Sequence, residues 1–228
     1  MKRLGLLFTF ITLLGLLVTT NTSCGDDNDS KFGFYVIPVN ASTGSPSLEF
    51  FIDDESVGSA TYGLAGVGRS LIREWAAMQI DIKNGNNKVG HLSYDDNKFE
   101  HRSIYAYGAY PNLSIAVLSD EYPDLGTKSG VRLINLNPAY KHVNLVDLQG
   151  NLIQGNRVYD GDTTLLGSSS YFNFKTAEAG TPQFLILDSE TGDTIKQASY
   201  EVEQNVGVTI FLHGLTTSDA AVGFVWHD

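Results

Sequence analysis

Met78-Gln79-Ile80-Asp81-Ile82-Lys83 alternates apolar and polar side chains without a break. Successive side chains of a β-strand point to opposite faces, so this pattern predicts a strand with one face buried and the other in water. Asn84-Gly85 follows and favours a tight hairpin turn of type I′, with Lys88 to Tyr94 as the returning strand. The three apolar residues are expected to face a core, and the three polar residues are expected to face water or polar neighbours.

Short strands of the same kind are expected on both sides of this hairpin. The chain of 228 residues holds 23 Gly, 11 Tyr and 12 Phe, a composition that favours strands and turns over helices. Phe34 to Asn40 is the first expected strand, and Pro38 within it cannot donate to a ladder, which predicts an edge or a bulge there. Ser59 to Gly68 is expected to be loop with a short strand. Leu71 to Ala77 fits a strand or a helical turn equally well.

The order of these segments occurs twice along the chain. The period is about 95 to 108 residues, which is too long for a solenoid unit and suits a whole β-sandwich domain. Asn135 stands in the second copy where Asn40 stands in the first. The paired segments are Val131 to Pro138 with Val36 to Ser42, His142 to Asp147 with Leu48 to Asp53, Val208 to Gly214 with Arg102 to Gly108, and Ala221 to Asp228 with Leu113 to Asp120.

This repeat predicts an all-β protein made of two tandem immunoglobulin-like β-sandwich domains, over residues 32–125 and 126–228. The charged, turn-rich stretch Asp120 to Gly130 is interpreted as the linker. Val131-Arg132 followed by Asn135 and Pro138, with a later strand of the form T-x-F-x-x-G, resembles the domain-of-unknown-function family 4397. The resemblance implies immunoglobulin-like sandwiches on exported, often lipid-anchored bacterial proteins, and it implies no activity and no catalytic residues.

The first 23 residues have the pattern of a signal peptide. Lys2 and Arg3 precede an uncharged apolar run, Leu4 to Val18, that is shorter than the roughly 20 residues needed to span a bilayer. Cys24 is the sole cysteine and follows the run, as the lipidated residue of a bacterial lipoprotein does. Asn21 departs from the aliphatic residue usual three places before that cysteine. Ordinary secretion with a free thiol at Cys24 is therefore the alternative.

Residues 24–31 are interpreted as an acidic tether, which resembles the export signal of surface lipoproteins in some Gram-negative bacteria. The expected location is the outer membrane, lipid-anchored through Cys24 and exposed at the cell surface. Cleavage after residue 23 would remove two of the 15 Lys and Arg and none of the 26 Asp and Glu, so the net charge would move from −11 to −13. A charge of this sign argues against nucleic acid as a partner.

No stretch of the sequence commits to a reaction. The five histidines lack the close spacing of metal ligands, and the serine-hydrolase pattern G-x-S-x-G does not occur. Acidic clusters at residues 53–55, 95–97 and 160–162 suit turns, with calcium binding as the alternative. No catalytic residue, metal site or cofactor is predicted, and the chain is not expected to be an enzyme.

The aromatic residues bear on what the protein binds. Tyr105 and Tyr107 share one strand face and would form a binding surface if that face were exposed. Trp226 alternates with Val222 and Phe224, which favours packing in the core. We therefore expect a non-enzymatic binding or structural role, with the membrane and a surface glycan or protein as partners. The alternatives are a glycan-binding accessory lipoprotein and a pilus-type subunit, and a hydrolase is the least favoured hypothesis.

Overall fold

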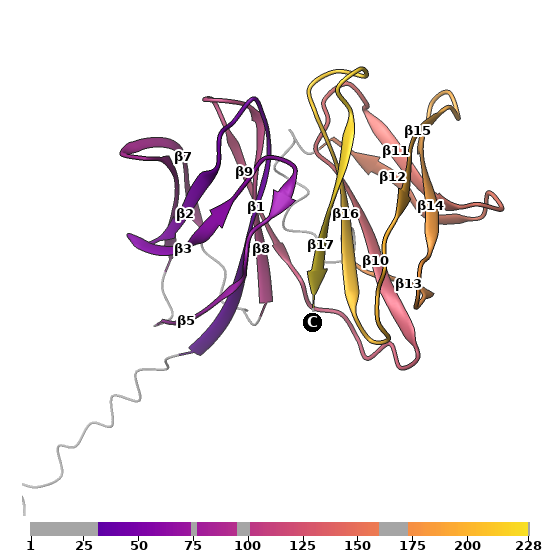
Figure 1. Cartoon of the computed structure of the whole chain (residues 1–228), viewed down its shortest axis with the longest axis horizontal. Coiled ribbons are helices and arrows are strands. Elements are labelled where there is room, and N and C mark those ends of the chain that lie inside the picture. Colours follow the sequence, from indigo (N-terminus) through magenta and orange to yellow (C-terminus); the bar gives the residue numbers. More distant parts are fainter. Residues whose placement is uncertain (1–31, 74–76, 95–100, 160–172, 228) are drawn as a thin grey trace, which may run out of the picture.

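The computed structural model describes residues 32–73, 77–94, 101–159 and 173–227. Every regular element in these ranges is a β-strand, which confirms the all-β class expected from the sequence. The strands form four sheets that stack as layers, from left to right in Figure 1. We name them, from the N-terminal side, the first outer, first central, second central and second outer sheets.

Residues 32–119 form the first pair of sheets. The first outer sheet has the order β3-β2-β6-β7, and its strands are β2 (Leu48–Ile52), β3 (Glu55–Ala60), β6 (Met78–Asn84) and β7 (Asn87–Tyr94). The first central sheet has the order β4-β1-β8-β9, with β5 also paired to β1. Its strands are β1 (Phe32–Thr43), β4 (Leu64–Ala65), β5 (Arg69–Arg73), β8 (His101–Ala109) and β9 (Ser114–Ser119).

Residues 128–227 form the second pair of sheets. The second central sheet has the order β13-β10-β16-β17, and its strands are β10 (Lys128–Asn135), β13 (Lys175–Glu178), β16 (Gly207–His213) and β17 (Ala221–His227). The second outer sheet has the order β12-β11-β14-β15, and its strands are β11 (His142–Asp147), β12 (Leu152–Val158), β14 (Gln183–Asp188) and β15 (Thr194–Ser199).

Three apolar cores separate the four layers. Alternate residues of β1 point in opposite directions, so Val36 packs toward the first outer sheet whereas Ile37 and Val39 pack toward the second central sheet. The central strands are buried on both faces for this reason, and β16 has no exposed residue. The middle core joins the two halves of the chain through Tyr105, Tyr107, Ile134, Leu136, Phe211 and Val225, among others.

The strand registers relate the two halves residue by residue. The first strand of each half pairs in parallel with the first strand of its last hairpin, Asn40 opposite Ala106 and Asn135 opposite Leu212. The side-chain amides of the two asparagines donate to the backbone carbonyls of Ala60 and Arg157, respectively. The equivalence of Asn40 and Asn135 inferred from the sequence is thus confirmed by their register and hydrogen bonds.

The last strands of the two halves, β9 and β17, are equivalent, but their residues align one position away from the alignment inferred from the sequence. Ile115 pairs with Ala106 as Val222 pairs with Leu212, which makes Ile115 and Val222 equivalent. The same register makes Asp120 equivalent to His227. The sequence comparison matched Asp120 with Asp228 instead.

Pro38 lies within β1 rather than at a sheet edge. Both hydrogen-bonding sides of this strand are occupied, one by β8 and the other by β5 and then β4. The pairing to β5 ends at Val36 and the pairing to β4 begins at Val39, so the missing N–H of Pro38 falls in the gap between them. The ambiguous segment after Gly68 is a strand, β5, as far as Arg73.

The hairpin of β6 and β7 departs from expectation in two respects. Asn84 pairs with Asn87, so the turn residues are Gly85 and Asn86, one step later than predicted. Only the first of them has a positive φ, +57° at Gly85, which fits type II′ rather than type I′. Asp81, expected to face water or polar neighbours, faces the polar side chains of Lys88 and His91 from β7, whose contacts of 2.6 and 2.7 Å bury it.

Candidate functional site between the central sheets

The two central sheets meet through matching positions of the two halves. Tyr105 and Phe211 are equivalent by register, and their rings meet edge to face with centroids 6.0 Å apart. A contact between a position and its own counterpart is what a twofold axis produces. The halves are therefore related by an approximate twofold axis that passes near this pair of rings.

A second pair of contacts obeys the same symmetry. The rings of Tyr62 and His213 meet edge to face with centroids 5.1 Å apart, and those of Tyr159 and Tyr107 meet edge to face with centroids 6.4 Å apart. The two halves exchange these contacts, because the first joins the first half to β16 and the second joins the second half to β8. Tyr105 and Tyr107 are both fully buried here, so the exposed tyrosine surface considered from the sequence is not formed by these residues.

A buried polar network lies at the other end of the middle core. Ser103 donates a hydrogen bond of 2.6 Å to Oδ2 of Asp120, and Arg132 pairs with Oδ1 of the same carboxylate at 2.5 Å. Arg132 Nε also donates to the Thr209 hydroxyl at 2.7 Å. That hydroxyl is 2.7 Å from Nε2 of His227, whose Nδ1 is 3.4 Å from Asp120. Residues of both halves thus share one set of hydrogen bonds.

The environment keeps the Asp120 carboxyl ionised. Burial alone would raise its pKa, but the charges of His227 and Arg132 and the hydrogen bond from Ser103 outweigh burial and lower the pKa to about 2. Asp120 and Arg132 are buried almost completely, with side chains 2% and 1% exposed. The carboxylate is therefore a fixed negative charge inside the protein, balanced by a guanidinium.

The order Asp120–His227–Thr209 is that of a hydrolase triad, with a threonine in the place of the nucleophile. Two observations argue against that role for Thr209. Its side chain has no exposed surface, so a substrate carbonyl has no path to it. Its hydroxyl oxygen also accepts a hydrogen bond from the positively charged Arg132, which lowers the nucleophilicity of that oxygen. The network is arranged to join the two halves.

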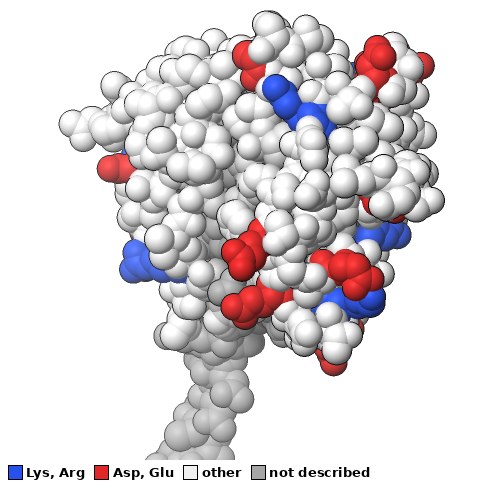
Figure 2. Space-filling view, turned by 45° about the vertical axis from the view of Figure 1, so that its right-hand side comes forward, with Lys and Arg blue, Asp and Glu red and all other residues white. Residues whose placement is uncertain are grey.

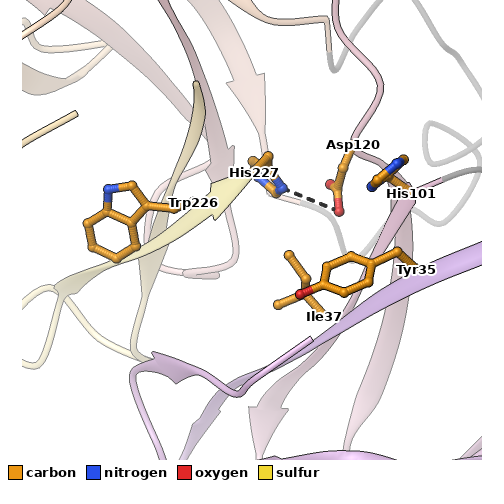
Figure 3. Close-up of a pocket in the computed structure, with 6 residues that line it drawn as sticks. All are labelled: Tyr35, Ile37, His101, Asp120, Trp226 and His227. Atoms are coloured by element: carbon orange, nitrogen blue, oxygen red, sulfur yellow. Dashed lines mark ion pairs between the residues drawn. The ribbon is translucent and has the colours of Figure 1, made fainter. Parts of the chain in front are cut away.

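A pocket opens beside this network, between β1, the start of β8 and the end of β17. Its volume is about 110 Å³, and Figure 3 shows Asp120 and His227 facing each other at its wall with the Tyr35 ring beside them. The Tyr35 and His101 rings lie 5.8 Å apart at an angle of 50°. The lining residues are Tyr35, Ile37, His101, Asp120, Trp226 and His227.

A wider and shallower hollow lies over the Trp226 ring. Trp226 is 45% exposed, which contradicts the core position expected from its alternation with Phe224. The indole Nε1 donates a hydrogen bond of 3.1 Å to the carbonyl of Glu201, and this bond fixes the orientation of the ring. The hollow has a volume of about 460 Å³ and is also lined by Glu201, Val202, Glu203 and Val206.

The lipidation candidate Cys24 lies outside the described residues, as do the acidic clusters at 95–97 and 160–162. In the remaining cluster, Asp53 and Asp54 have positive φ values of 46° and 66° between β2 and β3, and Asp53 accepts a hydrogen bond from the Gln79 backbone. This cluster is a turn. Within the part of the chain that the structure describes, no group of three His, Cys, Asp or Glu side chains could hold a metal ion.

No local pattern in the sequence predicted the polar network. Arg132 stood in the motif that carries the family resemblance, but no local pattern linked it to Asp120, which was assigned to the linker. The signal that could have found them is the repeat itself. Once Asp120 is aligned with His227 and Ser103 with Thr209, two hydrogen-bonding pairs occupy the same places in both halves.

Comparison with known proteins adds little to this geometry. No protein-family model and no curated protein sequence matches the chain. Among solved structures, it is similar to a candidate cell adhesion protein from Bacteroides eggerthii, with a TM-score of 0.20 and 7% identity over 86% of this chain and 95% of that one. A similarity at this level carries no conclusion. In the described ranges, no helix is long and apolar enough to cross a membrane.

Proposed function

We propose that the protein is a lipid-anchored, non-enzymatic surface protein that presents two rigidly joined immunoglobulin-like β-sandwiches at the outer membrane. The observation that carries this proposal is the middle core. Domains that share only a small polar contact move relative to one another, whereas a large apolar interface holds them in one orientation. Buried Tyr105, Phe211 and the Asp120–Arg132 ion pair favour a fixed arrangement of the two sandwiches.

The immunoglobulin-like description concerns the two-layer architecture of each half, as the resemblance to family 4397 implies. The strand order differs from the constant-type immunoglobulin order, in which the first two strands are neighbours. Here β1 and β2 lie in different sheets, and β1 pairs in parallel with β8. A pilus-type subunit would lack a strand that a partner donates, yet β1 already has partners on both sides.

The proposed anchor places the body close to the membrane. Seven residues separate Cys24 from Phe32, where β1 begins, and an extended chain spans at most about 3.6 Å per residue. The first strand would then start within about 30 Å of the lipid. Figure 2 shows basic side chains scattered singly among acidic ones on the face it presents. With a net charge of −11, this supports attachment by lipid rather than by basic contacts to anionic membranes.

Replacement of Cys24 by serine tests the anchor. The wild-type chain should incorporate an alkyne fatty acid in cells, fractionate with the outer membrane and be degraded by protease added to intact cells. Cys24→Ser should lose the label and leave the membrane fraction, since a stable anchor needs its acyl chains. A variant that stays in the membrane fraction without label would overturn the proposal, and protection of the wild type from protease would place it on the periplasmic face.

The exposed indole favours glycan binding as the second candidate function. A flat ring held in one orientation and flanked by Glu201 and Glu203 can stack on the apolar face of a sugar while the carboxylates accept its hydroxyl hydrogens. Trp226→Ala should abolish retardation of the protein in gels that contain the bound polysaccharide, and Trp226→Phe should keep part of it. Equal mobility of all three proteins across a panel of cell-surface polysaccharides would remove this candidate.

A further inference from the structure

The approximate twofold axis assigns a counterpart to the pocket beside Asp120. Strand registers make Ile37 equivalent to Arg132, and His227 equivalent to Asp120. The pocket above Ile37 therefore stands in the first half where the side chain of Arg132 stands in the second. One location is a hollow of about 110 Å³, and the other is filled by a guanidinium group.

The filled location shows how a guanidinium is held at this place in the fold. The Arg132 guanidinium lies over the Phe174 ring, 4.5 Å from its centroid, as a cation–π contact. It donates to Asp120 Oδ1 and to the carbonyl of Ser119. A ring face, a carboxylate and a backbone carbonyl thus surround a planar cation on three sides.

An aromatic ring also lies beside the pocket, but it comes from Tyr35 of β1, whereas Phe174 immediately precedes β13. The registers make Gly68 equivalent to Phe174 and Tyr35 equivalent to Gly130. A Cβ at Gly68 would lie 2.2 Å from the Tyr35 ring, and one at Gly130 would lie 3.2 Å from the Phe174 ring. In each half, the glycine makes room for the aromatic ring of the neighbouring strand. Tyr35 therefore occupies the place that Phe174 occupies beside Arg132.

The hollow also keeps acceptors for N–H groups. Asp120 reaches its wall, and Trp226 stands at the position equivalent to Ser119. His227 is 4% exposed in its side chain, and its Nδ1 has no hydrogen-bond partner although it lies 3.4 Å from Asp120 Oδ2. Two groups differ between the locations: the His227 imidazole stands where the Asp120 carboxylate stands beside Arg132, and Ile37 is too short to fill the space.

We propose that this pocket binds a guanidinium group from another molecule, stacked on Tyr35 and hydrogen-bonded at Asp120. The ligand is a free alkylguanidine such as arginine, or an arginine side chain of a partner protein. A planar cation is favoured over an anion because the equivalent location in the second half is filled by the Arg132 guanidinium, and the chain has a net charge of −11. The inference does not depend on the lipid anchor, because every lining residue belongs to the folded body.

Methylguanidinium is the probe. Titration of the purified full-length chain in detergent, followed by isothermal calorimetry and by the imidazole resonances of His101 and His227, should give saturable one-site binding. Methylammonium at the same ionic strength should bind at least tenfold more weakly, because it lacks the planar face and the paired N–H groups. N-acetylarginine amide and an arginine-containing peptide then distinguish the two sources, since extra contacts from a peptide would strengthen binding further.

Ile37→Arg is the decisive variant, because it places in the pocket the residue that the other half uses. Binding of methylguanidinium should be lost, while Ile37→Leu should keep it within about threefold. If Ile37→Arg fails to fold, Tyr35→Leu serves instead and should weaken binding at least tenfold by removing the ring. In Arg132→Ala, methylguanidinium should raise the unfolding temperature more than it does in the wild type, because a second site has been emptied.

Three results would overturn the inference. The first is binding that is unchanged in Ile37→Arg or in Tyr35→Leu, which would place the probe elsewhere. The second is equal binding of methylammonium and methylguanidinium, which would indicate nonspecific attraction to an acidic protein. The third is saturable binding of acetate or phosphate at the same histidine resonances with none of methylguanidinium, which would mean that the pocket selects an anion.

Discussion

Asp120 and Arg132 form an ion pair of 2.5 Å between the two central sheets, and their side chains are 2% and 1% exposed. Each residue belongs to a different half of the chain, so this contact joins the halves as well as balancing the two charges. The desolvation of two ions offsets much of their attraction, and a buried pair by itself is weak grounds for high stability. Removal of one partner, however, leaves the other charge buried and unpaired.

Asp120→Ala and Arg132→Ala should therefore each lower the free energy of unfolding by about 3 to 5 kcal/mol. The double variant should lose less than the sum of the two, since neither unpaired charge remains. Urea denaturation of the three variants measures the coupling. Lys128→Ala supplies the control, because the Lys128–Glu178 pair is well exposed and such pairs contribute only about 0 to 1 kcal/mol. Additive losses would show that the two charges act independently.

His213 should make the stability depend on pH between about 6.5 and 4. Burial lowers the pKa of its imidazole to about 4, and the charge of Asp219 only partly opposes this. A group whose pKa is depressed in the folded state stabilises the fold fully above its unfolded pKa, near 6.5, and that stability is lost as the pH falls through the folded value. The loss should be on the order of 3 kcal/mol, from about 1.4 kcal/mol per pKa unit.

The matched control is His213→Tyr, because the equivalent residue in the other half is Tyr107, which is also buried. The variant should unfold with a flatter dependence on pH between 6.5 and 4, and it should keep the contact with Tyr62. Asp120 should add a separate loss below about pH 4, since its pKa is lowered to about 2. A wild-type profile that is flat from pH 7 to 4.5 would contradict the assignment to His213.

The sequence predicted what local patterns determine. Alternation identified β6, and the repeat identified Asn40 and Asn135 as equivalent. Both asparagines make a local bond in which Oδ1 accepts from the backbone N–H two residues later. It could not predict the burial of Tyr105 and Tyr107. A strand with one face in a sandwich core and the other against a second sandwich has the same residue types as one that uses its outer aromatic face for binding.

The same limit applies to side chains whose partners lie far along the chain. Asp81 alternates with Ile80 as a water-facing residue would, but Lys88 and His91 from the adjacent strand cover it. Trp226 alternates as a core residue would, but it lies near the end of β17 beside an open hollow, and it is 45% exposed. In both cases the pattern gave the face of the strand correctly, whereas the depth of burial depended on what covers that face.

The β6–β7 hairpin allows a test of this distinction. Ile80 is 1% exposed, and Ile80→Ala should cost about 2 to 5 kcal/mol because it leaves a cavity in the first core. Asp81→Ala should cost about 1 to 2 kcal/mol, more than an ordinary surface change, because it removes two charge-assisted contacts at once. Gln79→Ala on the exposed face is the control and should stay within about 0.5 kcal/mol. Urea unfolding that gives equal losses for Asp81→Ala and Gln79→Ala would show that the covering ion pairs contribute nothing.

The middle core predicts how the second half behaves when it is separated from the first. A fragment of residues 126–228 would expose the face of β10, β16 and β17 that carries Ile134, Leu136, Phe211 and Val225. Because the halves are related by an approximate twofold axis, this face can pack against another copy of itself around Phe211. We expect the fragment to elute from size exclusion as a dimer, and Phe211→Lys in the fragment should shift it to a monomer of lower stability.

The same fragment mixed with residues 24–125 should form the heterodimer instead, because only that pairing restores the Asp120–Arg132 ion pair. A wild-type fragment that is monomeric and as stable as the full chain would mean that the two sandwiches fold independently and that the middle core contributes little.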